Sequence, residues 1–137
     1  MENWFQMNMP ESEINAHSSL SLAYLGDAVF ELMVRSWLMQ RQAARSGELH
    51  KTAVNYVKAP AQAEYAKKLL PILTEEELGV YKRGRNCHVN SVPHGANKGD
   101  YHAATGLEML FGYLYLKGQT ARLGELFAVL TEEEECR

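Results

Sequence analysis

The sequence predicts an all-α fold. The chain has only four prolines in 137 residues, so few positions are closed to a helix. Apolar residues recur at three- and four-residue spacing in several segments, whereas no segment shows the sustained alternation of a half-buried strand. We therefore expect one helical domain over residues 1–137, with its core over about 18–130.

The first long helix is expected from Ser18 or Ser19, either of which can cap it, to about Gln40. Its apolar residues cover most of the circumference, which is typical of a central helix. Asp27 and Glu31 interrupt this apolar stretch, so it does not fit a membrane span.

Helical spacing returns over 46–57, and Pro60 then fits the first turn of a helix over about 60–70. Thr74 and Glu77 have the spacing of a capping box, which predicts a helix that continues to about Arg83.

Residues 84–99 are rich in Gly, Asn, Pro and His and are expected to form one long loop. We expect a second apolar helix over 101–116, which ends at Lys117 and Gly118. An amphipathic helix over about 119–130 is expected to follow it.

The formal net charge is −3, from 14 Lys and Arg against 17 Asp and Glu, but the charge is unevenly distributed. Residues 35–98 are basic and the two ends are acidic. Either the basic middle contacts a polyanion, or these are ordinary helix surfaces with an acidic tail, and charge alone does not decide between them.

The two cysteines, Cys87 and Cys136, lie far apart and have no metal-ligand spacing, which favours a reducing compartment. No basic segment followed by an apolar run opens the chain, so no signal peptide is expected. We expect a cytoplasmic protein without a membrane partner.

Two acids stand out because their surroundings are apolar. Asp27 lies in the first long helix, and Glu108 is the only Asp, Glu, Lys or Arg between Tyr101 and Leu116. Each has a glycine nearby, Gly26 and Gly112 respectively, which indicates a close approach by another backbone or a ligand.

These acids allow two interpretations. In the first, each acid is the structural partner of a buried basic group. In the second, the two helices cross and both carboxylates face one Mg²⁺ ion. Glu31 extends the acidic face, but Arg35 four residues later is its expected partner.

The segment from Leu22 to Glu31, LAYLGDAVFE, resembles the signature motif of the ribonuclease III family, and the segment from Glu108 to Leu116, EMLFGYLYL, is similar to the second motif of that family. Arg83-Gly84-Arg85-Asn86 resembles the basic segment between them. The resemblance spans about residues 18–130 and is closest to the short branch, Mini-ribonuclease III, which has the catalytic domain and no double-stranded RNA-binding domain.

The resemblance implies a ribonuclease III catalytic-domain-like helical fold and a homodimer that cleaves double-stranded RNA with Mg²⁺. It places the metal-binding and catalytic roles on Asp27 and Glu108. In bacteria, the short branch is associated with trimming of 23S ribosomal RNA precursors. Such hydrolysis needs no side-chain nucleophile, and Thr105, one turn before Glu108, is placed to orient a metal-bound water.

Longer members of the family have two further acids, where this chain has Ala23 and Thr105. One alternative is therefore a non-catalytic RNA- or ribosome-binding protein with the same fold. A helical protein–protein module, with Asp27 and Glu108 as structural ion-pair partners, is another.

Duplex RNA is recognised through its shape, its phosphates and its 2′-hydroxyls. Basic or polar residues around the long loop and on the preceding helices are the candidate contacts: His50, Lys51, Lys58, Arg83, Arg85, Asn86 and Lys98. His88, His94 and His102 are alternatively zinc ligands, but their spacing is a weak signal. Apolar residues around Tyr24, Phe30 and Trp37 either form a two-fold interface or lie in the monomer core.

Overall fold

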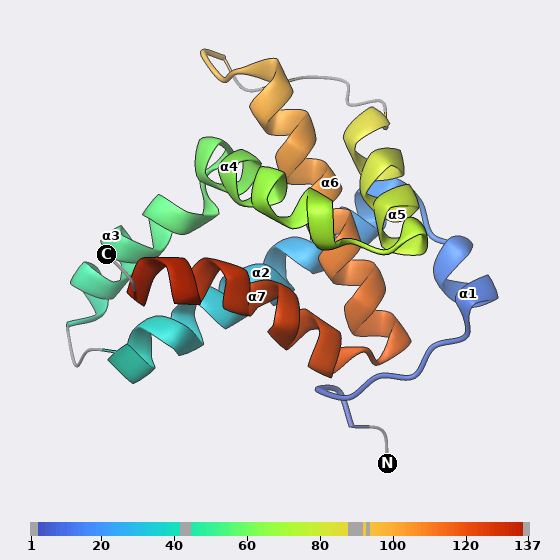
Figure 1. Cartoon of the computed structure of the whole chain (residues 1–137), viewed down its shortest axis with the longest axis horizontal. Coiled ribbons are helices and arrows are strands. Elements are labelled where there is room, and N and C mark those ends of the chain that lie inside the picture. The colour runs from blue at the N-terminus through green and yellow to red at the C-terminus, as the bar shows by residue number, and fades with distance from the viewer. Residues whose placement is uncertain (1–2, 42–44, 88–91, 93, 136–137) are drawn as a thin grey trace.

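A computed structural model describes residues 3–41, 45–87, 92 and 94–135, and within these ranges it contains helices and no strand (Figure 1). The prediction of an all-α fold is therefore confirmed. The elements are α1 (Glu11–Asn15), α2 (Ser19–Arg41), α3 (Ser46–Val57), α4 (Ala59–Leu69), the 3₁₀ turn η1 (Leu70–Ile72), α5 (Glu75–Asn86), α6 (Lys98–Lys117) and α7 (Thr120–Glu135).

Helix α6 is the centre of the fold and packs against α2, α4, α5 and α7. Its most extensive contact is with α2, and two glycines make that contact close. A Cβ atom at Gly26 would overlap the backbone carbonyl oxygen of Glu108, and one at Gly112 would overlap that of Leu22. The close backbone approach predicted from these glycines is confirmed.

The core lies between α2, α4, α6 and α7 and is rich in aromatic rings. Phe30 packs against the rings of Tyr65, Phe111 and Phe127 at centroid distances of 5.5–6.1 Å. Phe30 and Trp37 are buried, with 1% and 6% of their surface exposed. Of the two alternatives for Phe30 and Trp37, the monomer core is therefore the one observed, because α7 and α3 cover them within the monomer.

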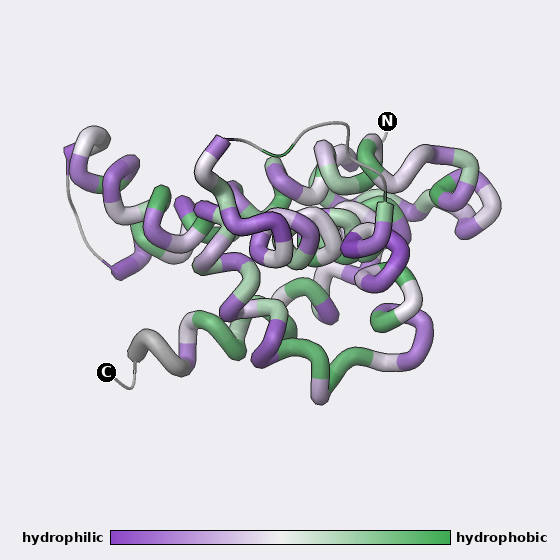
Figure 2. Tube along the Cα trace, turned by 90° about the horizontal axis from the view of Figure 1, so that it is seen from above, coloured by the Kyte–Doolittle hydropathy of each residue, from purple (hydrophilic) through white to green (hydrophobic). Residues whose placement is uncertain are grey.

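Figure 2 shows α7 along one side of the remaining helices, with hydrophobic residues along its length. It contacts α6 and α4, and the Tyr65 hydroxyl on α4 donates a hydrogen bond of 2.5 Å to the carbonyl of Leu126. Within the described ranges, no helix combines the length and apolar character needed to cross a membrane.

The capping box that opens α5 is present. The Glu77 amide donates to the Thr74 hydroxyl at 3.1 Å, and the Thr74 amide donates to the Glu77 carboxylate at 2.9 Å. Gly118 ends α6 in the left-handed region, with φ of 84°, as the break predicted there requires.

The predicted loop over 84–99 was too long at both ends. Helix α5 continues to Asn86 and α6 begins at Lys98, so Arg83, Arg85 and Asn86 lie in the last turns of a helix. Gly84 does not break α5, because it is buried where α5 meets α6, and a Cβ there would lie 2.8 Å from the Cα of Gly106.

Candidate active site

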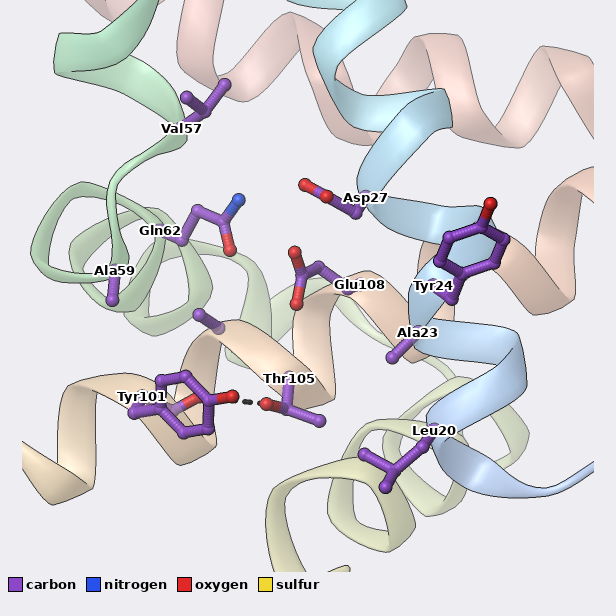
Figure 3. A pocket seen from close by; sticks show the side chains of 11 residues that line it. Leu20, Ala23, Tyr24, Asp27, Val57, Ala59, Gln62, Tyr101, Thr105 and Glu108 are labelled. Carbon is purple, nitrogen blue, oxygen red and sulfur yellow. Dashed lines mark hydrogen bonds between the residues drawn. The ribbon is translucent and has the colours of Figure 1, made fainter. Parts of the chain in front are cut away.

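A pocket of about 370 Å³ lies between α2, the junction of α3 with α4, and the first half of α6 (Figure 3). Each of these elements contributes side chains to it. The lining residues are Leu20, Ala23, Tyr24, Asp27, Val57, Ala59, Gln62, Tyr101, Ala104, Thr105 and Glu108.

The pocket brings Asp27 and Glu108 together, although they lie 81 positions apart in the sequence. The glycine contact between α2 and α6 accounts for this, because Gly26 precedes Asp27 and lies against the backbone of Glu108 itself. The two carboxylates point toward the same space, Asp27 from an exposed position and Glu108 from a half-buried one (Figure 3).

No basic side chain in the described ranges forms an ion pair with either acid. Burial, and then the charge and hydrogen bonding of nearby Asp27, raise the pKa of Glu108 from its ordinary value of 4.5 to about 8. Glu108 therefore holds a proton near neutral pH. A cation in the pocket would displace that proton, so cation binding is expected to strengthen as the pH rises toward 8.

The donor set fits a small hard cation. No group of three or more His, Cys, Asp or Glu side chains gathers anywhere in the described part of the chain, so a zinc-type cage is not formed there. Mg²⁺ is commonly held by one or two carboxylates and keeps several waters. Asp27 and Glu108 supply that number, in a pocket large enough for those waters.

Two neutral polar side chains also line the pocket. The Thr105 hydroxyl donates a hydrogen bond of 3.0 Å to the carbonyl of Tyr101, which leaves its oxygen free to accept one. Gln62 is 1% exposed, and among the described residues neither polar atom of its carboxamide has a partner. Gln62 was not predicted from the sequence, because a glutamine on an alanine-rich helix gives no sign of burial.

Glu31 lies outside the pocket. Arg35 donates to its carboxylate at 2.8 Å, so the ion pair predicted from their spacing is confirmed.

The structure places the candidate RNA contacts at three locations. Lys58 is exposed between two pocket residues, Val57 and Ala59. His50 and Lys51 lie further back on α3, where His50 lines a separate small pocket with the end of α2.

The remaining candidates lie at the C-terminal end of α5 and the N-terminal end of α6, which are on the same side of the molecule (Figure 1). Arg83 and Asn86 are exposed, and Lys98 is the exposed first residue of α6. Arg85 is half-buried, with its guanidinium 5.8 Å from the centre of the Tyr81 ring. Of the three possible zinc ligands, His88 lies outside the described residues.

Comparison with known proteins identifies the family. Residues 20–119 match the sequence model of the ribonuclease III domain. The protein named Mini-ribonuclease 3 in Symbiobacterium thermophilum is 49% identical over 78% of this chain and 82% of its own length. The protein named Mini-ribonuclease 3 in Brevibacillus brevis is 43% identical over 87% of this chain and 92% of its own length.

A crystal structure of a Fusobacterium nucleatum protein superimposes with a TM-score of 0.81 at 30% identity, and covers 89% of this chain and 98% of that one. The resemblance drawn from the motifs around Asp27 and Glu108 is thus confirmed for the family and for its short branch. The chain belongs to the ribonuclease III family of endoribonucleases.

Proposed function

We propose that this protein cleaves double-stranded RNA with Mg²⁺ as cofactor, acting as a single-domain homodimer in the cytoplasm on 23S ribosomal RNA precursors. The observation that carries the proposal is the meeting of Asp27 and Glu108 in one pocket with no basic partner in the described ranges. A structural pair of acids would be expected to have such a partner.

Bound Mg²⁺ would supply positive charge to the phosphate and make water easier to ionise. Asp27 and Glu108 would hold the ion, with Glu108 giving up its proton as it does so. The Thr105 oxygen would accept a hydrogen bond from water in the pocket and so orient it. Water would attack phosphorus and form a new P–O bond as the bond from phosphorus to the leaving oxygen breaks. The proton that the attacking water loses to solvent would balance the proton that the leaving oxygen takes up.

The seven candidate RNA contacts fit a duplex that lies over the pocket. Lys58 lies beside the pocket, because both of its neighbours in sequence line it. On the side of α5 and α6, the duplex would be contacted by Arg83, Arg85, Asn86 and Lys98. Along α3, it would be contacted by His50 and Lys51. Such contacts to phosphates make affinity fall steeply with salt.

Cleavage assays on duplex RNA test the proposal. Asp27→Asn is expected to reduce cleavage at least a thousandfold, because it removes a charged ligand of the ion, while thermal stability is kept. Glu31→Gln is the matched control, since it removes an acid one turn away whose partner is Arg35, and it should cleave normally. Cleavage by Asp27→Asn, or products in EDTA, would contradict the proposal. No metal-dependent product from the native protein would favour the non-catalytic alternative.

A homodimer is supported by apolar side chains that α2 exposes. Leu20, Tyr24 and Leu32 are 46%, 83% and 52% exposed. Ala28, four residues from Tyr24 and from Leu32, is exposed as well. This face of α2 is suited to a two-fold symmetric interface, in which the same apolar patch of each protomer packs against that of the other.

Sedimentation analysis checks the dimer. Leu32→Glu is expected to shift the protein to a monomer, because it places two charges in the interface. Ile72→Glu is the control, since Ile72 is 45% exposed but lies on η1, away from α2. A dimer that persists in Leu32→Glu would place the interface elsewhere.

A further inference from the structure

The carboxamide of Gln62 is buried without a hydrogen-bond partner. The side chain is 1% exposed, yet both its oxygen and its nitrogen lack a partner in the described structure. A buried polar group left unsatisfied destabilises the folded state, and leucine would fill similar space without that cost. We therefore expect a ligand or an ordered water in the pocket to form hydrogen bonds with the Gln62 carboxamide.

The position of Gln62 is fixed by the packing of α4. Its backbone amide donates to the carbonyl of Lys58 at 3.1 Å in the first turn of the helix. The following residues Ala63, Tyr65 and Ala66 are buried, and α4 packs against α6 and α7. The carboxamide thus projects from a rigid element and is not a mobile surface group.

The carboxamide faces the two carboxylates. Gln62 lines the same pocket as Asp27 and Glu108, and Figure 3 shows all three polar ends directed into one space. The other buried atoms without a partner in the described ranges, Trp37 Nε1 and His102 Nδ1, belong to residues that do not line this pocket.

We propose that Gln62 is a positioning residue for the divalent cation that Asp27 and Glu108 hold, with its carboxamide oxygen accepting a hydrogen bond from a water of the ion's hydration shell. The inference rests on the proposed function, because it takes the two carboxylates as ligands. Two carboxylates leave most of the six positions around Mg²⁺ to water, and those waters need acceptors. The NH₂ group of the same carboxamide donates to an ionised carboxylate oxygen.

A neutral amide suits this place better than an acid. An amide offers both an acceptor and a donor of hydrogen bonds without adding a further charge beside the two carboxylates.

The test measures Mg²⁺ binding without RNA, by calorimetry and by thermal unfolding of the full chain. Gln62→Leu has similar volume and no polar atoms. It is expected to unfold at the same or a higher temperature than the native protein in EDTA, and to bind Mg²⁺ about tenfold or more weakly, as loss of an outer-shell partner does. At limiting Mg²⁺ its cleavage should fall, and excess Mg²⁺ should restore it.

Two further variants control for packing. Gln62→Met replaces the carboxamide by an unbranched apolar side chain of similar length, and it is expected to bind Mg²⁺ about tenfold or more weakly, as Gln62→Leu is. Trp37→Phe removes a buried unpartnered N–H outside the pocket and should leave the Mg²⁺ affinity unchanged. These variants keep the test decisive even if Gln62→Leu folds poorly.

An Mg²⁺ affinity of Gln62→Leu within twofold of the native value would overturn this inference alone. Should Gln62→Leu fail to fold, an Mg²⁺ affinity of Gln62→Met within twofold of the native value would do the same. If the native protein and Asp27→Asn are equally insensitive to Mg²⁺, the proposed function itself fails and the inference falls with it.

Discussion

Asp27 and Glu108 face one another without a basic partner in the described ranges, whereas Glu76 and Glu77 on α5 each have one. Lys117 lies 2.6 Å from the Glu76 carboxylate, and the Arg122 guanidinium binds both oxygens of Glu77 at 2.8 Å. Hydrogen bonds to these cations hold the pKa of both Glu76 and Glu77 below the ordinary value, while the pKa of Glu108 is raised to about 8.

The difference separates two uses of an acid. Glu77 is as buried as a core residue, and its guanidinium partner makes it a support for the fold. Glu108 lies in a place where its charge is unfavourable, which is typical of a functional site. The same residue type thus stabilises one region and destabilises the other, and the partner decides which.

The largest effect on stability is expected at Glu108. Replacement by Gln should stabilise the cation-free protein near pH 8 by on the order of 3 kcal/mol, because the glutamate ionises readily in the unfolded chain and the glutamine does not. The folded native protein keeps the Glu108 proton between pH 4.5 and about 8 while the unfolded chain has lost it. Its free energy of unfolding therefore falls as the pH rises through that window. Urea unfolding in EDTA at several pH values measures this, and equal slopes for both proteins would contradict it.

Glu77→Ala should act in the opposite direction. It leaves Arg122 without its bidentate partner and removes half of the capping box, at a cost of about 2–3 kcal/mol. Urea unfolding at pH 7 checks this. Glu75→Ala is the control, because Glu75 is exposed in the same first turn, and it should cost less than about 1 kcal/mol. Equal losses in both variants would mean that the guanidinium pair contributes little.

The smallest effect is expected at Glu76, whose carboxylate is exposed. Glu76→Gln should cost less than about 1 kcal/mol at neutral pH, because solvent screens its pair with Lys117. Since the pKa of Glu76 is lowered in the folded state, its contribution is lost as the pH falls below 4.5, and the variant should be less sensitive to acid. Unfolding followed by circular dichroism during acid titration detects this, and a steeper acid transition in the variant would refute it.

Local sequence predicted much of the fold. The start of α5 follows from Thr74 and Glu77 alone, because a capping box involves residues three positions apart. The contact of α2 with α6 could be inferred from Gly26 and Gly112, since glycines in long apolar helices indicate close approach. The juxtaposition of Asp27 and Glu108 follows from that contact.

The features that sequence did not predict depend on tertiary contacts. Gly84 has the local character of a helix end, and only the opposing Gly106 explains why α5 continues past it. Helix α1 has five residues, too few to show a period, and Ile14 holds it against the core. Gln62 could not be recognised as a pocket residue, because its burial comes from α4 packing against α6.

The contact between Gly26 and the backbone of Glu108 also bears on ion selectivity under the proposed function. This backbone contact limits the distance between the two carboxylates, because Asp27 follows Gly26 directly. That distance matters because Mg²⁺ and Ca²⁺ have different metal–oxygen distances. A methyl group at Gly26 would push the helices apart and widen the site without altering a single ligand. Under the proposed function, the main chain of this protein would therefore contribute to discrimination between ions by their radius.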